Sequence, residues 1–409
     1  MRILNVTQTY VPFEEFGGPP VKVRALSEQM TKRKHEVTVL TVHWGSKNNG
    51  RREGPTRASF AAERSPFGWR KVENGIEANY LKSWLRYRTL GWNPGVKSFC
   101  SARLWNFDVV HIFGLYDLLG PRVAGACRKN GTPYVVEPMG MTIPIVRSLR
   151  LKRLYHRLLG ETMLNCAAAI VATSPQEAAE LKSAGMREDA IFLRRNGVEA
   201  PESVPERGRF RAAVGIPEEA KLVLYLGRLS EKKSPDLLLR AFAKLTKAQS
   251  KAKARLAFAG PDEGGMRARL AALAGELGVS SQVKLCGPVY GETKWSAYCD
   301  ADVFVLPSQN ENFGNAAGEA VLAGTPVILT DQCGIAPLLG TAALVVRHDV
   351  GELQEAMSRV LFEPGVQAWL RAGCRDAAGR LDWEEPGREM ERLYRRLAKS
   401  EREAVAAVS

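Results

Sequence analysis

Several common signatures are absent from this chain of 409 residues. No run of about 18 apolar residues occurs, so no membrane-spanning helix is predicted. The sequence has neither GxGxxG nor GxxxxGKS/T, so neither a dinucleotide fingerprint nor a Walker phosphate loop is predicted. Its seven cysteines are odd in number and form no CxxC pair, which is typical of reduced thiols in a cytosolic protein. The opening MRILNVTQTY has one charge and a short apolar run, which predicts a strand and not a signal peptide.

Acidic residues are in short supply, and the formal net charge is +14. A strongly basic protein favours an anionic partner, such as nucleic acid, a lipid surface or a phosphate-bearing substrate. Residues 45–71 hold seven Lys/Arg against two Glu, and residues 146–161 alternate Arg and Lys with Leu, Tyr and His. Each stretch alone is typical of a solvated loop or helix face. Together with the net charge, they indicate an N-terminal half that can face anionic lipid.

Short apolar runs alternate with helical patterns along the chain, which predicts parallel sheets covered by helices. In the first half, strands are expected at residues 3–7, 36–42, 109–113, 133–137 and 168–173. A helix is expected at 20–34, and another begins at Ser174, where Pro175 and Glu177 complete a capping box. In the second half, strands are expected at residues 222–226, 255–259, 283–286, 303–307, 326–330 and 343–346. The helices expected there cover residues 234–247, 265–277, 315–323, 350–362 and 383–399.

The pattern breaks near residue 200, where three prolines and no continuous strand are typical of a linker with a short helix. We therefore predict an α/β protein with two doubly wound Rossmann-like domains that face each other across a cleft. The predicted boundaries are 1–198 for the first domain, 199–220 for the linker and 221–380 for the second domain. An amphipathic C-terminal helix within 381–409 is expected to pack back on the first domain.

Ligands of open parallel sheets bind beyond the carboxyl ends of the strands, so the residues after each strand deserve most weight. Gly17 and Gly18 follow the first strand and precede a helix, where glycine lets a ligand approach the backbone. Arg228, Lys232 and Lys233 follow the first strand of the second half. Three cations at a strand end can hold a phosphate, although solvated loop charges would give the same pattern.

The segment ENFGNAAGEAVLAGTPV, residues 311–327, follows another strand. Gly314 permits a sharp turn, Asn315 is predicted as the N-cap of the next helix, and the small residues after it let an anion reach the helix start. Glu311 precedes this helix and Glu319 lies in its second turn. This placement does not suit two carboxylates that share a proton, so we interpret them as ligand contacts; a loop acid and helix-dipole compensation are the simpler alternatives.

Together these motifs resemble the retaining glycosyltransferases of the GT-B fold, family 4 (glycosyl transferases group 1). The likeness rests on GRLSEKKSPDLLLRAF (227–242), VFVLPSQNENFGNAAGEAVLAGTPVILT (303–330) and NGVE (196–199). FGGPPVKVRALSEQM (16–30) and DVVHIFGLY (108–116) are similar to the first domain of that family.

The resemblance implies roles for individual residues. Arg228 and Lys233 would bind the diphosphate of a nucleotide-sugar and stabilise the leaving group, with Lys232 as the alternative to Lys233. Glu311 would bind hydroxyls of the transferred sugar, and Glu319 would hold the ribose. Further donor contacts are implied for Gly17, Gly18, Val289, Tyr290, Asn312, Phe313, Gly314 and Asn315. Contacts with the sugar or the acceptor are implied for His111, Met139 and Asn196.

The chain departs from the family pattern at one position. The family often has His-x-His where this chain has His111-Ile112-Phe113, so a histidine that the family places near the sugar is missing. Asp300-Ala301-Asp302 superficially resembles a metal-binding DxD motif, but its position between a helix and a core strand favours a structural role. No metal and no cofactor are therefore expected.

The resemblance implies a retaining, metal-independent hexosyltransferase. It would move a sugar from a nucleotide-diphosphate-sugar to a lipid-linked or saccharide acceptor in bacterial cell-surface polysaccharide synthesis. It would act in the cytoplasm or on the inner face of the plasma membrane. Alternatives are a sugar-nucleotide epimerase of the same fold, a phosphorylase, for which no lysine-bound cofactor signature is clear, and a glycosidase, which the clustered cations disfavour. A basic nucleic-acid-binding protein is suggested by charge alone, without a recognition motif.

Overall fold

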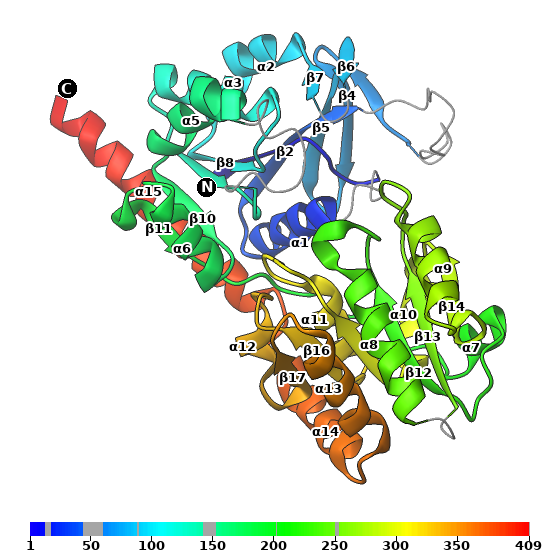
Figure 1. Ribbon diagram of the computed structural model, residues 1–409. Coiled ribbons are helices and arrows are strands. Elements are labelled where there is room, and N and C mark those ends of the chain that lie inside the picture. Colours follow the sequence, from blue (N-terminus) through cyan, green and yellow to red (C-terminus); the bar gives the residue numbers. More distant parts are fainter. Residues whose placement is uncertain are drawn as a thin grey trace. The chain divides into compact units, whose positions relative to one another are not determined.

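The computed structural model describes residues 1–12, 18–43, 60–87, 90–141, 153–201, 203–249 and 253–408. The chain forms two compact units, each a Rossmann-like α/β domain (Figure 1). Unit 1 comprises Met1–Gly197 together with Trp383–Ser409, and unit 2 comprises Val198–Asp382. The predicted α/β class with two such domains is confirmed.

The sheet of unit 1 has the strand order β11-β10-β9-β8-β1-β2-β5-β4-β3. Its parallel strands are β1 (Arg2–Thr7), β2 (Glu36–His43), β5 (Ile76–Lys82), β8 (Val109–Phe113), β9 (Tyr134–Glu137), β10 (Ala169–Ala172) and β11 (Ile191–Leu193). β4 (Gly68–Glu73) runs antiparallel to β5, and β3 (Glu63–Ser65) antiparallel to β4. The strand order reverses at β1, because β2 lies on one side and β8 on the other.

The remaining elements of unit 1 lie around this sheet. They are α1 (Gly18–Lys32), β6 (Leu85–Tyr87), β7 (Leu90–Trp92), α2 (Gly95–Arg103), η2 (Leu104–Asn106), α3 (Leu119–Asn130), η3 (His156–Gly160), α5 (Glu161–Asn165), α6 (Pro175–Ser183) and η4 (Glu188–Ala190). Ser174 caps α6 as predicted, since its hydroxyl accepts the amide of Glu177. The carboxylate of Glu177 instead accepts the amides of Thr173 and Gly140, so it also anchors the loop after β9.

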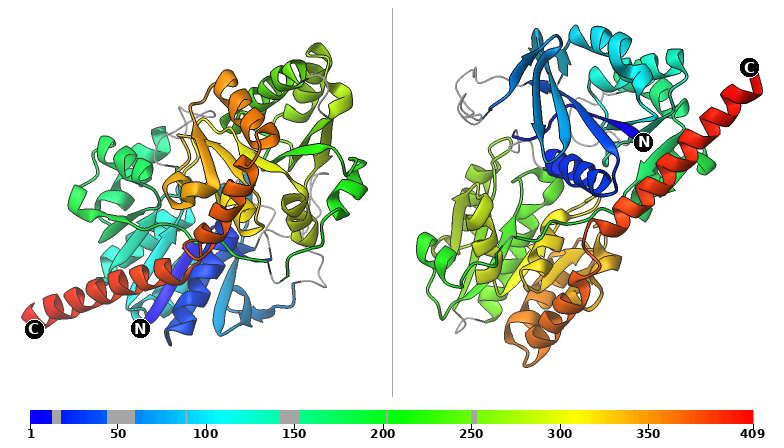
Figure 2. Two further views of the ribbon diagram at one scale, coloured as in Figure 1. Left: turned by 90° about the horizontal axis from the view of Figure 1, so that it is seen from below. Right: turned by 180° about the vertical axis from the view of Figure 1, so that it is seen from behind.

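The C-terminal helix α15 (Glu384–Val408) belongs to unit 1 by its contacts. It packs against α1 and β8 (Figure 2). Met390, Leu393 and Tyr394 are buried and join the core of unit 1. These apolar residues recur at helical spacing, so one face of the helix is covered while charged residues occupy the other.

Unit 2 contains a fully parallel sheet with the order β14-β13-β12-β15-β16-β17. The strands are β12 (Lys221–Leu226), β13 (Ala254–Ala259), β14 (Val283–Gly287), β15 (Val303–Leu306), β16 (Val327–Thr330) and β17 (Ala343–Val346). Along β12, Leu222 and Leu224 pack into one core, while Val223 and Tyr225 pack into another on the opposite face. This alternation is the two-residue period of a strand that is buried on both faces.

Helices cover both faces of that sheet. They are α7 (Arg209–Val214), η5 (Glu231–Lys233), α8 (Pro235–Ala248), α9 (Met266–Glu276), η6 (Ser280–Gln282), α10 (Gly291–Asp300), α11 (Asn315–Leu322), α12 (Ala336–Leu339), η7 (Gly340–Ala342), α13 (Val350–Phe362) and α14 (Val366–Ala378). In α8, Leu238, Leu239, Phe242 and Leu245 are fully buried, as expected for a stripe at i, i+4 and i+7.

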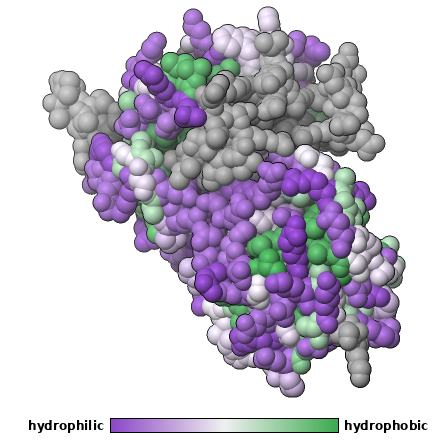
Figure 3. All heavy atoms as spheres, in the orientation of Figure 1, coloured by the Kyte–Doolittle hydropathy of each residue, from purple (hydrophilic) through white to green (hydrophobic). Residues whose placement is uncertain are grey.

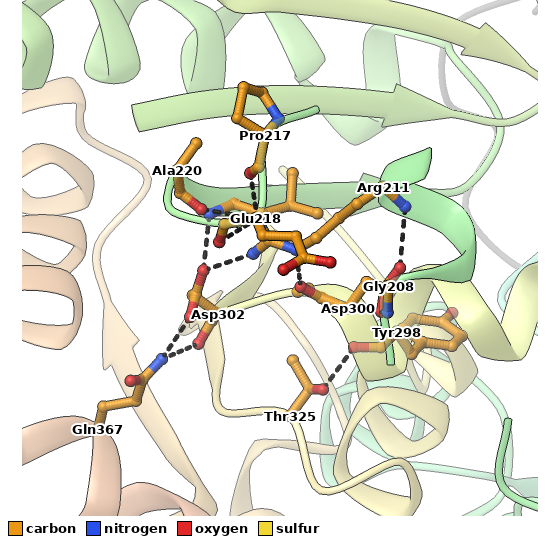
Figure 4. Close-up of polar contacts among 12 residues, drawn as sticks. Gly208, Arg211, Pro217, Glu218, Ala220, Tyr298, Asp300, Asp302, Thr325 and Gln367 are labelled. Carbon is orange, nitrogen blue, oxygen red and sulfur yellow. Dashed lines mark hydrogen bonds and ion pairs between the residues drawn. The ribbon is translucent and has the colours of Figure 1, made fainter. Parts of the chain in front are cut away.

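A buried arginine joins α7 to the sheet of unit 2 (Figure 4). The guanidinium of Arg211 donates to the carboxylate of Asp302 at 2.9 Å and to the carbonyl of Asp300 at 3.0 Å. The Asp300 carboxylate accepts the amides of Gly208 and Arg211. Residues 208–220 are therefore held firmly to unit 2.

The described surface in the view of Figure 3 is mostly hydrophilic, with small hydrophobic patches over both units. Among the described helices, none combines the length and the apolar character that crossing a bilayer requires.

Candidate functional site

The sheet of unit 2 reverses its strand order between β12 and β15, since β13 and β14 lie on one side and β16 and β17 on the other. Loops that leave two such strands diverge to opposite faces and leave room for a ligand. Lys233 follows β12 and Glu311 follows β15, and the Lys233 Nζ lies 2.6 Å from Glu311 Oε2. The structure thus brings together two residues, 78 positions apart in the sequence, that the motifs had singled out.

Backbone hydrogen bonds fix both partners of this pair. The amide of Glu311 donates to the carbonyl of Gln332 at 2.9 Å, and the Glu311 carbonyl accepts the amide of Gly334 at 3.0 Å. On the other loop, the carbonyl of Lys232 accepts the amide of Gln309 at 3.0 Å. The two loops are therefore tied to each other, which holds the ammonium and the carboxylate in place.

Arg228 lies on the same loop as Lys233, just after β12. Its carbonyl accepts the hydroxyl of the buried Tyr225 at 2.7 Å. Its guanidinium is half exposed and lies 3.6 Å from a carboxylate oxygen of Glu263. The side chain can therefore leave this loose pair for an anionic ligand at little cost, since exposed ion pairs contribute about 0–1 kcal/mol.

Gly314 precedes α11 with φ of 103°, a conformation that favours glycine. A Cβ at this position would lie 3.1 Å from Ile335 Cγ2 and 3.3 Å from Leu306 Cδ2. The prediction of Asn315 as the N-cap is wrong: Gly314 occupies the cap and Asn315 is the first helical residue. The physical reason is the left-handed turn, which only glycine makes without strain. Among the described residues, no group donates to the buried Asn315 Oδ1.

Small residues continue along α11 as the sequence suggested. A Cβ on Gly318 would lie 2.6 Å from Val198 Cγ2, so the close packing requires glycine. Phe313 is buried in the core beneath this loop. Asn312 lies in the same turn, beside the start of the helix.

Glu319 is held by two residues of α10 that the sequence motifs did not reveal. Lys294 Nζ lies 2.9 Å from Oε1, and the Tyr298 hydroxyl donates to Oε2 at 2.9 Å. Burial raises the pKa of Tyr298, and the charge of Glu319 raises it further, so the phenol remains a donor. The spacing of four residues on one helix was the available signal, but nothing in the sequence placed α10 beside α11.

Two further predicted donor contacts, Val289 and Tyr290, lie just before the start of α10. Tyr290 precedes the first residue of that helix and is 60% exposed. Val289 is half-buried and packs against the core of unit 2. Both follow β14, so they share the carboxyl edge of the sheet with the loops already described.

In unit 1, His111 lies within β8 and is fully buried. Its Nδ1 is 2.6 Å from the Tyr394 hydroxyl of α15, and its ring stacks on Phe113 with centroids 3.9 Å apart. Burial lowers the pKa of His111 to about 3, so the ring is neutral at physiological pH. Phe113, which stands where the family often has a second histidine, is also buried.

Glu137, the last residue of β9, lies beside His111 in a buried ion network. Lys22 Nζ lies 2.5 Å from Glu137 Oε1, and Arg194 donates to Oε2 at 2.6 Å. Burial pushes the pKa of Glu137 up, but Arg194 and Lys22 outweigh it and hold that pKa at about 2. The sequence pattern missed this network because its three members are far apart in the sequence.

Two other predicted residues of unit 1, Met139 and Asn196, follow strands. Met139 has a φ of 56° and its methyl would lie 3.3 Å from a Cβ on Gly114, the residue after β8. Asn196 is 3% exposed and follows β11. Gly18 is the first residue of α1, and Gly17 lies outside the described residues.

Both aspartates of the DxD-like motif are bound by groups of the protein. Asp302 pairs with Arg211, and the Asp300 carboxylate accepts two backbone amides. Within the described ranges, no group of three or more His, Cys, Asp or Glu residues is arranged to hold a metal ion.

Comparison with known proteins covers nearly the whole chain. Residues 206–376 match the family described as glycosyl transferases group 1, and residues 17–197 match the glycosyl transferase 4-like domain. A D-inositol 3-phosphate glycosyltransferase from Nocardiopsis dassonvillei is 31% identical over 306 residues, which are 71% of this chain and 70% of that protein. The chain belongs to the group 1 glycosyltransferases. The predicted resemblance to this family is therefore confirmed.

One further relative of this group 1 glycosyltransferase matches over a shorter stretch, and one solved structure matches over nearly the whole chain. A D-inositol 3-phosphate glycosyltransferase from Saccharomonospora viridis is 33% identical over 216 residues, so the match spans 51% of this chain and only half of that protein. The Anabaena protein HepE, solved with UDP and glucose, is 16% identical with a TM-score of 0.74 and covers 96% of this chain and 99% of its own. At that identity the likeness shows the GT-B fold alone.

Proposed function

We propose that the chain is a retaining, metal-independent hexosyltransferase. It moves a sugar from a nucleotide-diphosphate-sugar to a saccharide or lipid-linked acceptor in bacterial cell-surface polysaccharide synthesis. The observation that carries this proposal is the Lys233–Glu311 pair at the point where the strand order of unit 2 reverses. The ammonium of Lys233 suits the diphosphate of such a donor, and the carboxylate of Glu311 suits the hydroxyls of its sugar.

When the donor binds, Lys233 and Glu311 separate and each binds a different part of the donor. The diphosphate draws Lys233 from the carboxylate, and Glu311 is then free to accept hydrogen bonds from sugar hydroxyls. When the sugar–phosphate bond breaks, negative charge grows on the diphosphate, and Lys233 and Arg228 stabilise it. The start of α11 adds backbone amides and the positive end of the helix dipole.

The nucleoside end is bound by Glu319. Lys294 and Tyr298 each bond one of its two oxygens, which fixes the carboxylate so that its remaining lone pairs accept ribose hydroxyls. Tyr290 is exposed, and we assign the base of the donor to its side. The donor would thus lie along the strand-end loops of unit 2, with its sugar at Glu311 and its base toward Tyr290.

Two lines support the finer assignments. Asp300 and Asp302 are engaged with Arg211 and backbone amides, so fixed cations are left to do the work that a metal would do for the leaving group. HepE was solved with UDP and glucose, and the two relatives are named for D-inositol 3-phosphate. HepE thus favours a nucleotide-sugar donor, and the name of the two relatives favours a hydroxyl-bearing acceptor.

The net charge of +14 fits a cytoplasmic enzyme that also works at the inner face of the plasma membrane.

The test begins with a donor screen. Melting temperature is measured with UDP, GDP, ADP and their sugars, because a ligand of the folded state raises it. With the donor known, released nucleoside diphosphate is measured with EDTA present, and the anomeric configuration of the product is read by NMR. Lys233→Ala and Glu311→Gln are each expected to reduce kcat about 10²- to 10³-fold. Arg269→Ala, which removes an exposed ion pair with Glu231 in the same unit, is the matched control. Absence of any nucleotide response, or near-wild-type turnover in both variants, would refute the proposal.

A further inference from the structure

Three tryptophans of unit 1 point into solvent and take no part in the candidate site. Trp84, Trp92 and Trp105 are 72%, 50% and 67% exposed. A single exposed hydrophobic residue needs no explanation, but a group of large ones marks an interaction surface. These three lie within 22 positions of one another in the sequence.

Contacts connect the three residues in space. The amide of Trp84 donates to the carbonyl of Trp92 at 3.0 Å, so both flank the short β6–β7 hairpin. The Arg122 guanidinium of α3 lies 3.6 Å from the centroid of the Trp92 ring. α3 also packs against η2, which carries Trp105. Figure 1 shows β6, β7, α2 and α3 together at one end of unit 1. We call Trp84, Trp92, Trp105 and Arg122 the tryptophan surface.

The sequence segment that carries this surface is strongly basic, although Glu77 of β5 pairs with Arg103. Residues 82–130 contain no glutamate and two aspartates, Asp108 and Asp117, of which the second is buried. The same segment contains eight basic residues: Lys82, Arg86, Arg88, Lys97, Arg103, Arg122, Arg128 and Lys129. Lys82, Lys97, Arg128 and Lys129 are exposed in the structure. A partner for this end of unit 1 must therefore be anionic and must accept indole rings.

We propose that the tryptophan surface docks on an anionic lipid bilayer. Indole rings partition to the boundary between headgroups and acyl chains, where the ring is buried and its N–H stays hydrated. Basic side chains nearby add attraction to anionic headgroups. The inference rests on the proposed function in one respect, since a lipid-linked acceptor gives the enzyme a reason to approach the membrane.

Vesicle binding by the full chain tests this inference. Sedimentation is compared for vesicles of phosphatidylcholine alone and of phosphatidylcholine mixed with phosphatidylglycerol. The wild type should bind the mixed vesicles, and rising salt should weaken binding. The triple variant Trp84→Ser, Trp92→Ser, Trp105→Ser should bind them at least about tenfold more weakly. Trp369→Ser is the matched control, because Trp369 of unit 2 is 53% exposed and should not matter.

Fluorescence gives a readout that needs no variant. Brominated phosphatidylcholine in the mixed vesicles should quench the tryptophan emission of the bound wild type. Equal binding by the triple variant and the wild type, an equal loss in Trp369→Ser, or bound protein without quenching would each overturn the proposal. Oligonucleotide binding is measured for the same proteins. If the triple variant loses oligonucleotide binding while its vesicle binding is unchanged, the tryptophan surface binds nucleic acid instead of lipid. The UDP-induced rise in melting temperature should be the same in wild type and triple variant, so failure of the donor site and failure of this surface are read separately.

Discussion

Replacing Glu137 by glutamine should strongly destabilise unit 1. The amide keeps the volume of the side chain but removes the charge that lies between Lys22 and Arg194, and the side chains of all three are at most 7% exposed. Two cations would then face a neutral group without access to water. Removing one partner from a buried ion pair costs about 3–5 kcal/mol, a large share of the roughly 5–15 kcal/mol that stabilises a typical protein.

The pKa of Glu137 gives an independent measure of the same interaction. It lies at about 2 in the folded state against 4.5 for an ordinary glutamate, a difference worth about 3 kcal/mol. A depressed carboxyl pKa stabilises the fold above the unfolded pKa, and that stability is lost as pH falls from about 4.5 toward 2. The wild type should therefore lose stability over this range, and Glu137→Gln should lose less.

Urea unfolding followed by circular dichroism measures the loss, and hydrogen exchange of peptides from β9 assigns it to unit 1. Glu188→Gln is the control, because Glu188 forms an exposed ion pair with Lys182 in the same unit and should cost less than about 1 kcal/mol. If Glu137→Gln costs no more than Glu188→Gln, or if the acid slope is unchanged, the buried network does not stabilise unit 1.

Two further predictions concern other charged groups. Burial raises the pKa of Asp117 to about 6, so the stability of the wild type should fall as pH rises from about 4 to 6. The variant Asp117→Asn should lack this pH dependence. In urea unfolding at pH 7.5 it should be more stable than the wild type by on the order of 2–3 kcal/mol. In unit 2, Lys294→Met and Tyr298→Phe leave Glu319 less firmly held, so each should weaken UDP binding about tenfold in calorimetry while kcat changes little. Glu292→Gln on the same helix should leave UDP affinity unchanged, and a similar loss in that control would contradict the assignment.

The sequence predicted the parallel strands well because burial on both faces leaves continuous apolar runs. Each of the eleven predicted strands is present within one or two residues, from Arg2–Thr7 to Ala343–Val346. Predicted helices with strong apolar stripes, such as Pro235–Ala248, are also confirmed. Helices α2, α3 and α14 and the parallel strands β5 and β11 were not predicted, since short or mixed sequences give a weaker period.

Elements that depend on distant partners were not predictable from local pattern. The antiparallel strands β3 and β4 are largely half-buried or exposed. They exist because β4 pairs with β5 and β3 pairs with β4 at the edge of the sheet. The same limit applies to the candidate site. The sequence indicated Lys233 and Glu311 through their motifs, but Lys294 and Tyr298 became recognisable only when α10 was placed beside Glu319.

Lys233 and Glu311 neutralise each other, and this determines how the variants should behave. The two side chains are 25% and 19% exposed, so water reaches the pair, while a diphosphate carries more negative charge than a carboxylate and gives Lys233 more charge-assisted hydrogen bonds. The exchange of partners therefore favours the donor. In Lys233→Ala, the unpaired carboxylate of Glu311 would repel the diphosphate in addition to the lost contact. The double variant Lys233→Ala, Glu311→Ala should therefore bind UDP more tightly than Lys233→Ala alone, while remaining as slow in turnover. Calorimetry of the four proteins in this cycle measures the effect, and weaker or equal binding by the double variant would show that the two residues do not act on the same diphosphate.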